Sequence, residues 1–522
     1  MWWKILLGLL AAILIGFFIM VERVGVTPGI LLNSLFGMGS GTPEASTIQS
    51  SLKVPPGFSV GLYAGHINNA RFIRFTRAGD LIVTQPRESR ISLVMRDANG
   101  DGIADGTRVL MDNLVRPHSI DFHEGYLYIA ESNTVGRVRF DHETGTLTGD
   151  YERIITGLGD EGNHWTKTIL FGPDDLLYLS AGSTCNVCRE TDPMRAAITR
   201  YQPDGSGKER FATGLRNAVG MDFSPIDGHL YATDNGRDLL GDDYPPCELN
   251  RVEAGQFYGW PNVNGFGDPD PDFGDEAKRE EAIPPVHGFR PHNAPLGIRF
   301  IQLESFPEEY RNVALVALHG SWNRSTYDGY KVVSLHPNSE GSYDERDFLS
   351  GFENNGDIIG RPVDVAAGPD GCVYVSDDYA MAIYRVCHGE EAGQLALAPE
   401  SSSLSGQPAS TGLEDFGPVE LQSLVAEGKT LFQSRGCTGC HLVNGGKSGF
   451  GLKRLENLDD RYSVNSLRSF FKTPTPPCRR FAWTMRTRNW RLPPTCWSSS
   501  ASRAYAGTGA AYSVIGSPLI LA

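Results

Sequence analysis

A pattern of alternating apolar and polar residues recurs six times along the middle of the chain. Each copy has an apolar strand, a turn rich in Pro, Asp or Gly, and a second alternating strand, as in Leu-Phe-Gly-Pro-Asp-Asp-Leu-Leu-Tyr-Leu at 170–179. Alternation with a period of two residues around a turn predicts a β-hairpin rather than a helix. The copies lie at 74–83, 120–129, 169–179, 221–232, 298–316 and 365–375.

The repetition predicts the fold class. Hairpins spaced by roughly 50 to 75 residues are typical of propeller blades, since each hairpin buries its faces only against its neighbours. We therefore predict an all-β six-bladed β-propeller over residues 52–388, with loops that meet at the mouth of a central channel. An immunoglobulin-like sandwich would not show this self-similarity.

The chain before the propeller has a different pattern. Residues 5–21 are apolar almost without a break, which is the lower end of the length that a membrane span needs. We expect residues 1–23 to form an N-terminal transmembrane helix whose N-terminus is cytoplasmic, and a cleaved signal peptide is the alternative.

Three further segments follow the propeller. Residues 391–415 include a run rich in Ser, Pro and Gly, which predicts a flexible linker. A helical pattern over 421–432 predicts a small all-α domain at 416–477. Residues 478–522 lose all periodicity, and we interpret them as a tail from a shifted reading frame that does not pack as a domain.

Composition and charge narrow the class of partners. The chain has 522 residues, of which 60 are Gly and 32 are Pro, so it is turn-rich and long enough for two or three domains. A net charge of -15 argues against nucleic acid as a partner. Small molecules and cationic proteins remain possible partners.

The motif Cys437-Thr-Gly-Cys440-His441 predicts a covalently bound c-type haem. The two thiols are expected to attach the haem, and His441 would be the proximal iron ligand. With this motif, residues 416–477 resemble a truncated cytochrome c domain. A stray redox pair or half of a zinc site is the alternative. No methionine follows in a context suitable for the second axial ligand. Such a haem indicates an oxidising compartment, and we expect the bacterial inner membrane with the propeller in the periplasm.

Polar clusters stand on the loops that enter and leave the hairpins. A histidine lies in 162–167, an Arg-Asn pair in 214–220, and a Gly-Arg pair between aspartates in 234–238. A neutral imidazole can accept a proton, arginines can bind carboxylates, and loop oxygens can bind calcium. These residue types predict a site at the mouth of the channel.

The loop motifs also stand in a specific order. Gly-Leu-Arg-Asn at 214–217, Asp-Asn-Gly-Arg-Asp at 234–238, Glu-Leu-Asn-Arg-Val at 248–252, Tyr-Gly-Trp-Pro at 258–261 and Leu-His-Gly-Ser-Trp-Asn at 318–323 follow one another. With this set the chain resembles the sugar dehydrogenases that bind pyrroloquinoline quinone (PQQ), and more closely their sorbosone and pyranose dehydrogenase branch.

The resemblance implies roles for individual residues. His164 would be the general base, Arg216 and Asn217 would lie at the quinone oxygens, and the backbone carbonyls of Gly236 and Arg237 would bind Ca²⁺. Ala218 stands where the family usually has proline. Weaker candidates for the cofactor site, matched by position alone and equally readable as solvated or turn residues, are Gln85, Arg324, Lys331 and Arg361.

A second calcium loop is a further candidate. Oxygen-bearing residues alternate around glycines at Asp97, Asn99, Asp101 and Asp105, as in a calcium loop. The twelfth position holds Arg108 in place of the usual glutamate. A structural Ca²⁺ and a plain turn rich in Asx hydrogen bonds are both open.

Five cysteines of the propeller allow two bridges. Cys185 and Cys188 are placed to form a local disulfide, with a metal or redox site as the alternative. Cys372 and Cys387 are placed to pair across one blade, and Cys247 is left over.

These features predict one function and leave two alternatives. We expect a membrane-anchored quinoprotein that oxidises an aldose, sorbosone-like or related sugar with PQQ and Ca²⁺. Its own haem c would take the electrons and pass them to a downstream cytochrome or respiratory-chain acceptor. The alternatives are a calcium-dependent lactonase or esterase on the same propeller, and a non-catalytic propeller that docks a redox partner.

Overall fold

The computed structural model describes residues 40–339, 341–389, 441–442 and 453–454. The chain divides into two units, Met1–Glu400 and Ser401–Ala522. The predicted membrane segment, linker and tail lie outside the described residues, and so do Cys437 and Cys440. Within the described ranges, no helix has the length and apolar character that crossing a membrane requires.

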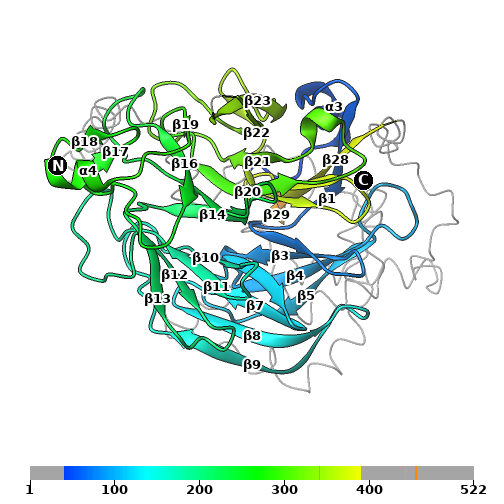
Figure 1. Cartoon of the computed structure of the whole chain (residues 1–522). Helices are drawn as coiled ribbons and strands as arrows, with labels where there is room; N and C mark the ends of the chain where they lie inside the picture. Colours follow the sequence, from blue (N-terminus) through cyan, green and yellow to red (C-terminus); the bar gives the residue numbers. More distant parts are fainter. Residues whose placement is uncertain (1–39, 340, 390–440, 443–452, 455–522) are drawn as a thin grey trace, which may run out of the picture. The chain divides into compact units, whose positions relative to one another are not determined.

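Six four-stranded antiparallel sheets make up the described part of the first unit and confirm the predicted six-bladed propeller (Figure 1). The first three blades are β2 (Ile73–Phe75), β3 (Leu81–Gln85), β4 (Arg90–Met95), β5 (Gly106–Met111); β6 (Ser119–His123), β7 (Tyr126–Ala130), β8 (Thr134–Asp141), β9 (Thr146–Thr156); and β10 (Lys167–Phe171), β11 (Leu177–Ala181), β12 (Ala197–Tyr201), β13 (Glu209–Thr213). The last three are β14 (Ala218–Phe223), β15 (Leu230–Asp234), β16 (Cys247–Val252), β19 (His287–Phe289); β20 (Pro295–Ile301), β21 (Val313–Leu318), β22 (Lys331–Pro337), β23 (Tyr343–Leu349); and β26 (Pro362–Ala367), β27 (Val373–Asp377), β28 (Ala382–His388), β1 (Phe58–Ala64).

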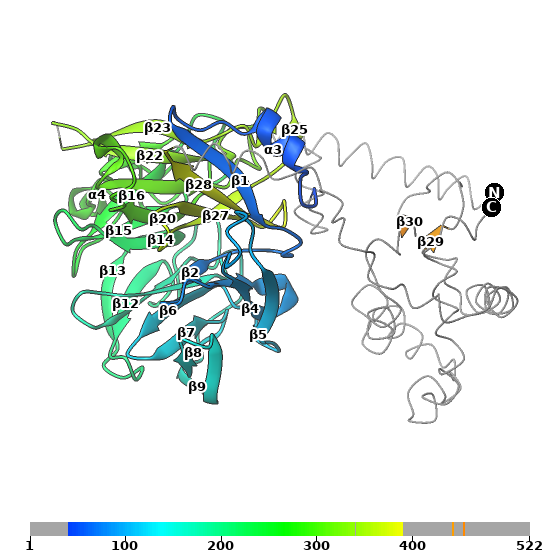
Figure 2. The same ribbon diagram turned by 90° about the vertical axis from the view of Figure 1, so that its right-hand side faces the viewer.

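The ring of blades closes through a strand from each end of the unit. The innermost strands β2, β6, β10, β14, β20 and β26 each contact the next one around the axis, and β26 contacts β2. In the sixth blade β1 pairs antiparallel with β28, with Phe58 opposite His388. Figure 2 shows β1 beside β27 and β28 in a second view. This pairing completes the sheet with residues that are more than 300 positions apart in the sequence.

The apolar core consists of one cluster between each pair of neighbouring blades. Between the fifth and sixth blades, for example, Phe58 packs edge-on against Phe306, Tyr310 and Phe348. Inner strands are buried on both faces, so β3 and β21 are buried at every residue. Burial on both faces explains the continuous apolar run of β21 and the apolar first three residues of β3.

Two layers of side chains fill the axis of the propeller. Phe72, Val219, Leu296 and Val363 form an apolar cluster near the starts of the inner strands. Further along these strands is a charged layer, in which Arg74 pairs with Asp364 and Arg299 pairs with Asp222. These two carboxylates also accept backbone N–H groups of the following blade. The axis is therefore filled with side chains, which close the propeller below the edge where a site can lie.

Short elements and disulfides complete the described residues. The short elements are α3 (Ala45–Ser51), α4 (Glu276–Glu281), the 3₁₀ turns η1 (Pro86–Glu88) and η2 (Glu308–Tyr310), and the strand pairs β17 (Val263–Asn264) with β18 (Asp268–Pro269) and β24 (Glu353–Asn354) with β25 (Asp357–Ile358). In the second unit β29 (His441–Leu442) pairs in parallel with β30 (Lys453–Arg454). Both predicted disulfides, Cys185–Cys188 and Cys372–Cys387, are present, and Cys247 is free and buried.

Candidate active site

The predicted site residues converge at one edge of the propeller, where the inner strands begin. His164 lies just before β10, and Arg216 and Asn217 lie just before β14. Gly236 and Arg237 follow the end of β15, which runs antiparallel to β14 and therefore ends at the same edge. Three separate stretches of sequence thus supply one face of two neighbouring blades.

Gly182 is the point at which two of these stretches meet. It follows β11, and a methyl group in its place would lie 2.5 Å from Asn217 Oδ1 and 2.7 Å from His164 Cβ. Both distances are too short for non-bonded atoms. The Cβ atom of His164 and the amide of Asn217 therefore sit against the same backbone position, which has room only for glycine.

The hydrogen bonds of Ser183 determine which ring nitrogen of neutral His164 carries the proton. Its Nδ1 lies 3.0 Å from the carbonyl oxygen of Ser183 and 2.9 Å from the hydroxyl oxygen, while that hydroxyl donates to the carbonyl of Cys185. A carbonyl can only accept, so Nδ1 carries the proton of the neutral ring and Nε2 keeps its lone pair. Burial, followed by the charge of Arg216, lowers the pKa of His164 to about 3.

Arg216 is held in place by a buried hydrogen-bond network. Its Nε donates to the carbonyl of Asn186 at 2.9 Å, and Nη2 donates to the side chain of Asn186 at 2.8 Å and to Asp238 at 2.7 Å. Nη1 donates to the carbonyl of Asn235 at 3.0 Å. A guanidinium has five N–H groups, so one on Nη1 remains for a ligand. The positive charge is therefore fixed before any ligand arrives.

Buried acceptors without partners mark the same edge. The side-chain oxygens of Asn217 and Asn323 are buried, and no described residue donates a hydrogen bond to either. Leaving such an acceptor unpaired costs about 1–3 kcal/mol. These atoms therefore fit a planar ligand that offers N–H or O–H groups, as PQQ does.

The loop after β15 presents backbone oxygens. The side chain of Arg237 is turned away into ion pairs with Asp270, at 2.6 Å, and with Asp272. No described residue donates a hydrogen bond to the carbonyl of Gly236 or of Arg237. A cavity of about 10 Å³, room for about one water, lies beside them. Free carbonyls and nearby carboxylates are the oxygen ligands that calcium takes, so the loop fits this ion.

The weaker cofactor candidates have other partners. Gln85 donates to the carbonyl of Asn68 and accepts from Arg90 and Ser92, so its amide is used within the first blade. Lys331 pairs with Asp347 of the next strand at 2.6 Å.

Two arginines instead reach toward the edge that carries the site. Arg361 donates to the carbonyls of His319 and Gly320, and Arg324 donates to the carbonyl of Asp242. Arg324 thereby joins its loop to the one that follows Gly236. Cofactor roles for these two arginines, as for Gln85 and Lys331, remain predictions.

The second calcium candidate folds as a network of Asx hydrogen bonds. Asp97 accepts the backbone N–H groups of Gly100, Asp101 and Gly102, at 2.7–3.1 Å. Asn99 and Asp101 each accept an N–H two residues ahead, and Asp105 accepts that of Ala98. These bonds account for the shape of the loop, and an ion there remains a prediction.

Several residues of this edge have roles that the sequence did not identify. Arg71 and His319 both bind Asp378, each at 2.9 Å, and together they lower the pKa of that carboxyl well below its usual range. Asn186 and Ser183 hold Arg216 and His164. Their only signal was their place next to Cys185, within a loop whose cysteines predicted a closure.

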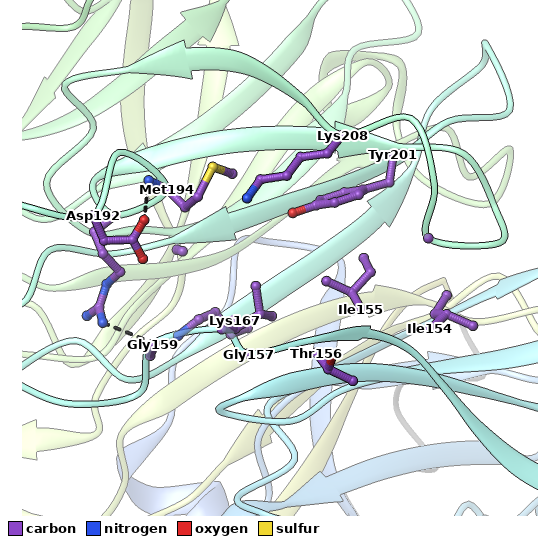
Figure 3. Close-up of a pocket in the computed structure, with 14 residues that line it drawn as sticks. Ile154, Ile155, Thr156, Gly157, Gly159, Lys167, Asp192, Met194, Tyr201 and Lys208 are labelled. Carbon is purple, nitrogen blue, oxygen red and sulfur yellow. Dashed lines mark hydrogen bonds between the residues drawn. The ribbon is translucent and has the colours of Figure 1, made fainter.

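A further cavity is not lined by this cluster. It has a volume of about 310 Å³ and lies between the second and third blades. Figure 3 shows Tyr201 and Lys208 on one side of it and Ile154 and Ile155 on the other. Lys167 also lines this cavity, and burial lowers its pKa to about 7. None of the five residues matched to catalytic or calcium roles is part of its wall.

Comparison with known proteins gives the family of the large unit. The model of the TrAA12-like family matches residues 52–252 and 256–388, more than half of the chain. The chain belongs to the TrAA12-like family. A cytochrome c family model matches residues 425–478, which contain the Cys-Thr-Gly-Cys-His motif. The predicted resemblance of the propeller to PQQ-dependent sugar dehydrogenases and the predicted C-terminal cytochrome c domain are both confirmed.

Individual relatives agree with this family. An uncharacterized protein of Borreliella burgdorferi is 30% identical over 373 residues, 68% of this chain and 96% of that protein. A PQQ-dependent pyranose dehydrogenase of Coprinopsis cinerea is 27% identical over 349 residues, which are 56% of this chain and 46% of the dehydrogenase.

Solved structures support the fold. The PQQ domain of the Coprinopsis cinerea pyranose dehydrogenase, in its holo form, superposes with a TM-score of 0.56 at 22% identity over 65% of this chain and 97% of that one. A calcium structure of a Trichoderma reesei family AA12 enzyme gives 0.57 at 19% identity over 65% and 97%. At these identities the likeness of the TrAA12-like domain concerns the fold alone.

Proposed function

We propose that this protein is a PQQ- and calcium-dependent sugar dehydrogenase that passes electrons to its own haem c. The observation that carries the proposal is the meeting of His164, Asn217 and Arg216 at one edge of the propeller, beside unpaired buried acceptors. The relatives that are PQQ-dependent pyranose dehydrogenases support the cofactor. An aldose or a sorbosone-like sugar is the proposed substrate.

The residues divide the chemistry between them. When bound, PQQ supplies an electrophilic carbonyl carbon that accepts a hydride from the sugar carbon. His164 Nε2 takes the hydroxyl proton of that carbon, and the bond from Nδ1 to Ser183 keeps the ring oriented. Arg216 supplies a fixed positive charge, and the carbonyls of Gly236 and Arg237 hold Ca²⁺.

The low pKa of His164 is consistent with this role. A base must be neutral when the substrate arrives, and burial beside Arg216 keeps the imidazole neutral at neutral pH. A bound anion next to the ring favours its protonated form and raises the pKa toward the range of an effective base.

The electron outlet rests on the second unit. Cys437 and Cys440 would attach the haem and His441 would ligate its iron, which the cytochrome c match over 425–478 supports. A downstream cytochrome or respiratory-chain carrier is the proposed acceptor. We also propose that residues 1–23 anchor the protein in the bacterial inner membrane with the propeller in the periplasm.

Reconstitution of the full chain tests the proposal. Apoprotein is loaded with PQQ and Ca²⁺, and reduction of an artificial dye is measured with a panel of aldoses and related sugars. The wild type should reduce the dye. His164→Ala should lower the rate by about 10²–10⁴-fold because general-base catalysis is lost, while the affinity for PQQ is retained.

The matched control concerns the haem. His441→Ala should leave dye-linked sugar oxidation intact and abolish sugar-dependent haem reduction, since the dye takes electrons directly from the propeller. Absence of any quinone-dependent spectral change on adding sugar would contradict the proposal and favour a calcium-dependent lactonase. An enzyme of that kind has no need of an electron outlet.

A further inference from the structure

We propose that the disulfide-closed loop Cys185–Cys188 positions the active site, and that Asn186 is its positioning residue. The inference rests on the proposed function above. The loop contacts Arg216 and the loop that contains Asp238 directly, and it reaches His164 through Ser183, which bonds both His164 and Cys185.

Two of these groups take three of the four hydrogen-bonding positions of the Asn186 side chain. Its Oδ1 accepts from Arg216 Nη2 and from the backbone N–H of Asp238, both at 2.8 Å. Its Nδ2 donates to the carbonyl of Asp238 at 3.0 Å. Asn186 therefore pairs with both backbone groups of Asp238, one residue after the carbonyl proposed to bind Ca²⁺.

The backbone of the same loop makes the remaining contacts. The carbonyl of Asn186 accepts from Arg216 Nε at 2.9 Å and from Trp260 Nε1 at 3.3 Å. The carbonyl of Cys185 accepts the hydroxyl of Ser183 at 2.7 Å, which leaves the hydroxyl oxygen to accept from His164. The orientation of the base and the position of the cation thus depend on the same short segment.

The disulfide explains how a loop of only four residues, 185–188, can fix the positions of Arg216 and Asp238. A bridge between residues three apart removes most of the conformations open to the two residues between them. Asn186 is one of those two. The loop is further fixed by Thr184, whose N–H donates to Glu190 at 2.6 Å. Little ordering entropy then remains to be lost when a ligand binds.

Substitution of Asn186 tests the positioning. Asn186→Ala removes three hydrogen bonds to Arg216 and Asp238 without substituting either of those residues. Because one of these bonds is made by the charged guanidinium of Arg216, the Kd for PQQ should rise about ten- to a hundredfold. Quenching of tryptophan fluorescence measures this Kd, since Trp260 donates to the Asn186 carbonyl.

A matched control comes from the fifth blade. With described residues, Asn338 also makes three side-chain hydrogen bonds, in the turn between β22 and β23 at the other edge of the sheet. Asn338→Ala should cost stability and leave the Kd for PQQ at the wild-type value. An equal loss of PQQ affinity in both variants would overturn the proposal.

The two disulfides provide a second comparison. Replacing Cys185 and Cys188 together by Ser should weaken PQQ binding about as much as Asn186→Ala, and combining the changes should add little. Replacing Cys372 and Cys387 by Ser should lower the Tm without changing the Kd, because that bridge lies at the opposite edge of the sixth blade. Additive losses at the first bridge would contradict a common origin.

Hydrogen exchange separates this inference from the proposed function. In the apoprotein, the amide of Asp238 donates to Asn186 and should exchange faster in Asn186→Ala and in the Cys185/Cys188 variant. Unchanged exchange would overturn the positioning role even if PQQ binds. If the wild type failed to bind PQQ, the proposed function would fall, and the exchange of Asp238 alone would decide the positioning.

Discussion

Burial, two arginines and one carbonyl determine how the imidazole ring of His164 is protonated. Burial first, and then the charges of Arg216 and Arg195, disfavour the charged imidazolium and lower the pKa, whereas the carbonyl of Ser183 favours a proton on Nδ1. The ring is therefore neutral, with its lone pair on Nε2. The same arginine that would stabilise charge on a cofactor also keeps the base ready to accept a proton.

Removal of the Arg216 charge should raise the pKa of His164. In Arg216→Gln the nearest repelling cation is gone, so the protonated ring becomes less unfavourable and the pKa moves from about 3 toward the ordinary 6.5. NMR titration of the imidazole in the apoprotein measures the shift. Arg139→Gln, on the outside of the second blade, should leave it unchanged, and an unmoved midpoint in Arg216→Gln would refute the electrostatic explanation.

The site could be predicted only where a residue's type and motif carry its role. His164, Arg216 and Asn217 stand in ordered motifs, and the structure brings them together. Gln85 was matched by position alone, and neighbours take its polar atoms. Asn186 could not be identified, since its importance comes from a loop closure that places it against residues 30 and 52 positions away.

Among the elements, the two inner strands of each blade were the predictable ones. They are buried on both faces and separated by tight turns, so their sequences repeat clearly. The outer strands left a weaker signal because most of their residues are exposed or half-buried, as in β5 and β9. The pairing of β1 with β28 had no local signal at all, because its partners lie at opposite ends of the propeller sequence.

Gly182→Ala should impair activity more than stability. The added methyl group would press on Asn217 and His164, so both must move at the end of β11. We expect sugar oxidation to fall at least tenfold, as a displacement near 1 Å can cost a hundredfold. Steady-state assays of the reconstituted protein measure this effect.

Gly172→Ala is the control within the same blade. Its methyl group would lie 2.5 Å from Asp174 and 2.7 Å from Tyr178, a comparable clash at the turn between β10 and β11. It should lower the Tm by a similar amount and keep the wild-type rate. Equal rate losses in the two variants would mean that strain in the blade, rather than displacement of His164 and Asn217, causes the effect.

For the whole molecule, stability depends on the closure of the ring. Phe58 on β1 is 9% exposed and touches three aromatic rings of the fifth blade. Phe58→Ala should destabilise the propeller by about 3 kcal/mol through lost burial and a cavity. Chemical denaturation followed by tryptophan fluorescence measures the change.

Phe266→Ala should change the unfolding midpoint little, since that ring is 63% exposed. If both substitutions cost the same, the strand β1 would not be a stability determinant. The comparison holds the chemical change constant and varies only the packing.

The pairing of Phe58 with His388 also fixes where the chain enters and leaves the propeller. His388 lies at the edge of the sixth blade opposite to Asp377, whereas Asp377 lies beside Arg361 at the edge that carries the site. A linker that begins after His388 therefore starts on the far face from His164. A strand of seven residues spans roughly 20 Å, and 25 flexible residues have an r.m.s. span of roughly 25–30 Å. If residues 391–415 form the predicted flexible linker, most of its reach would be taken up by the height of one blade, and its length would set which face a tethered electron acceptor could visit.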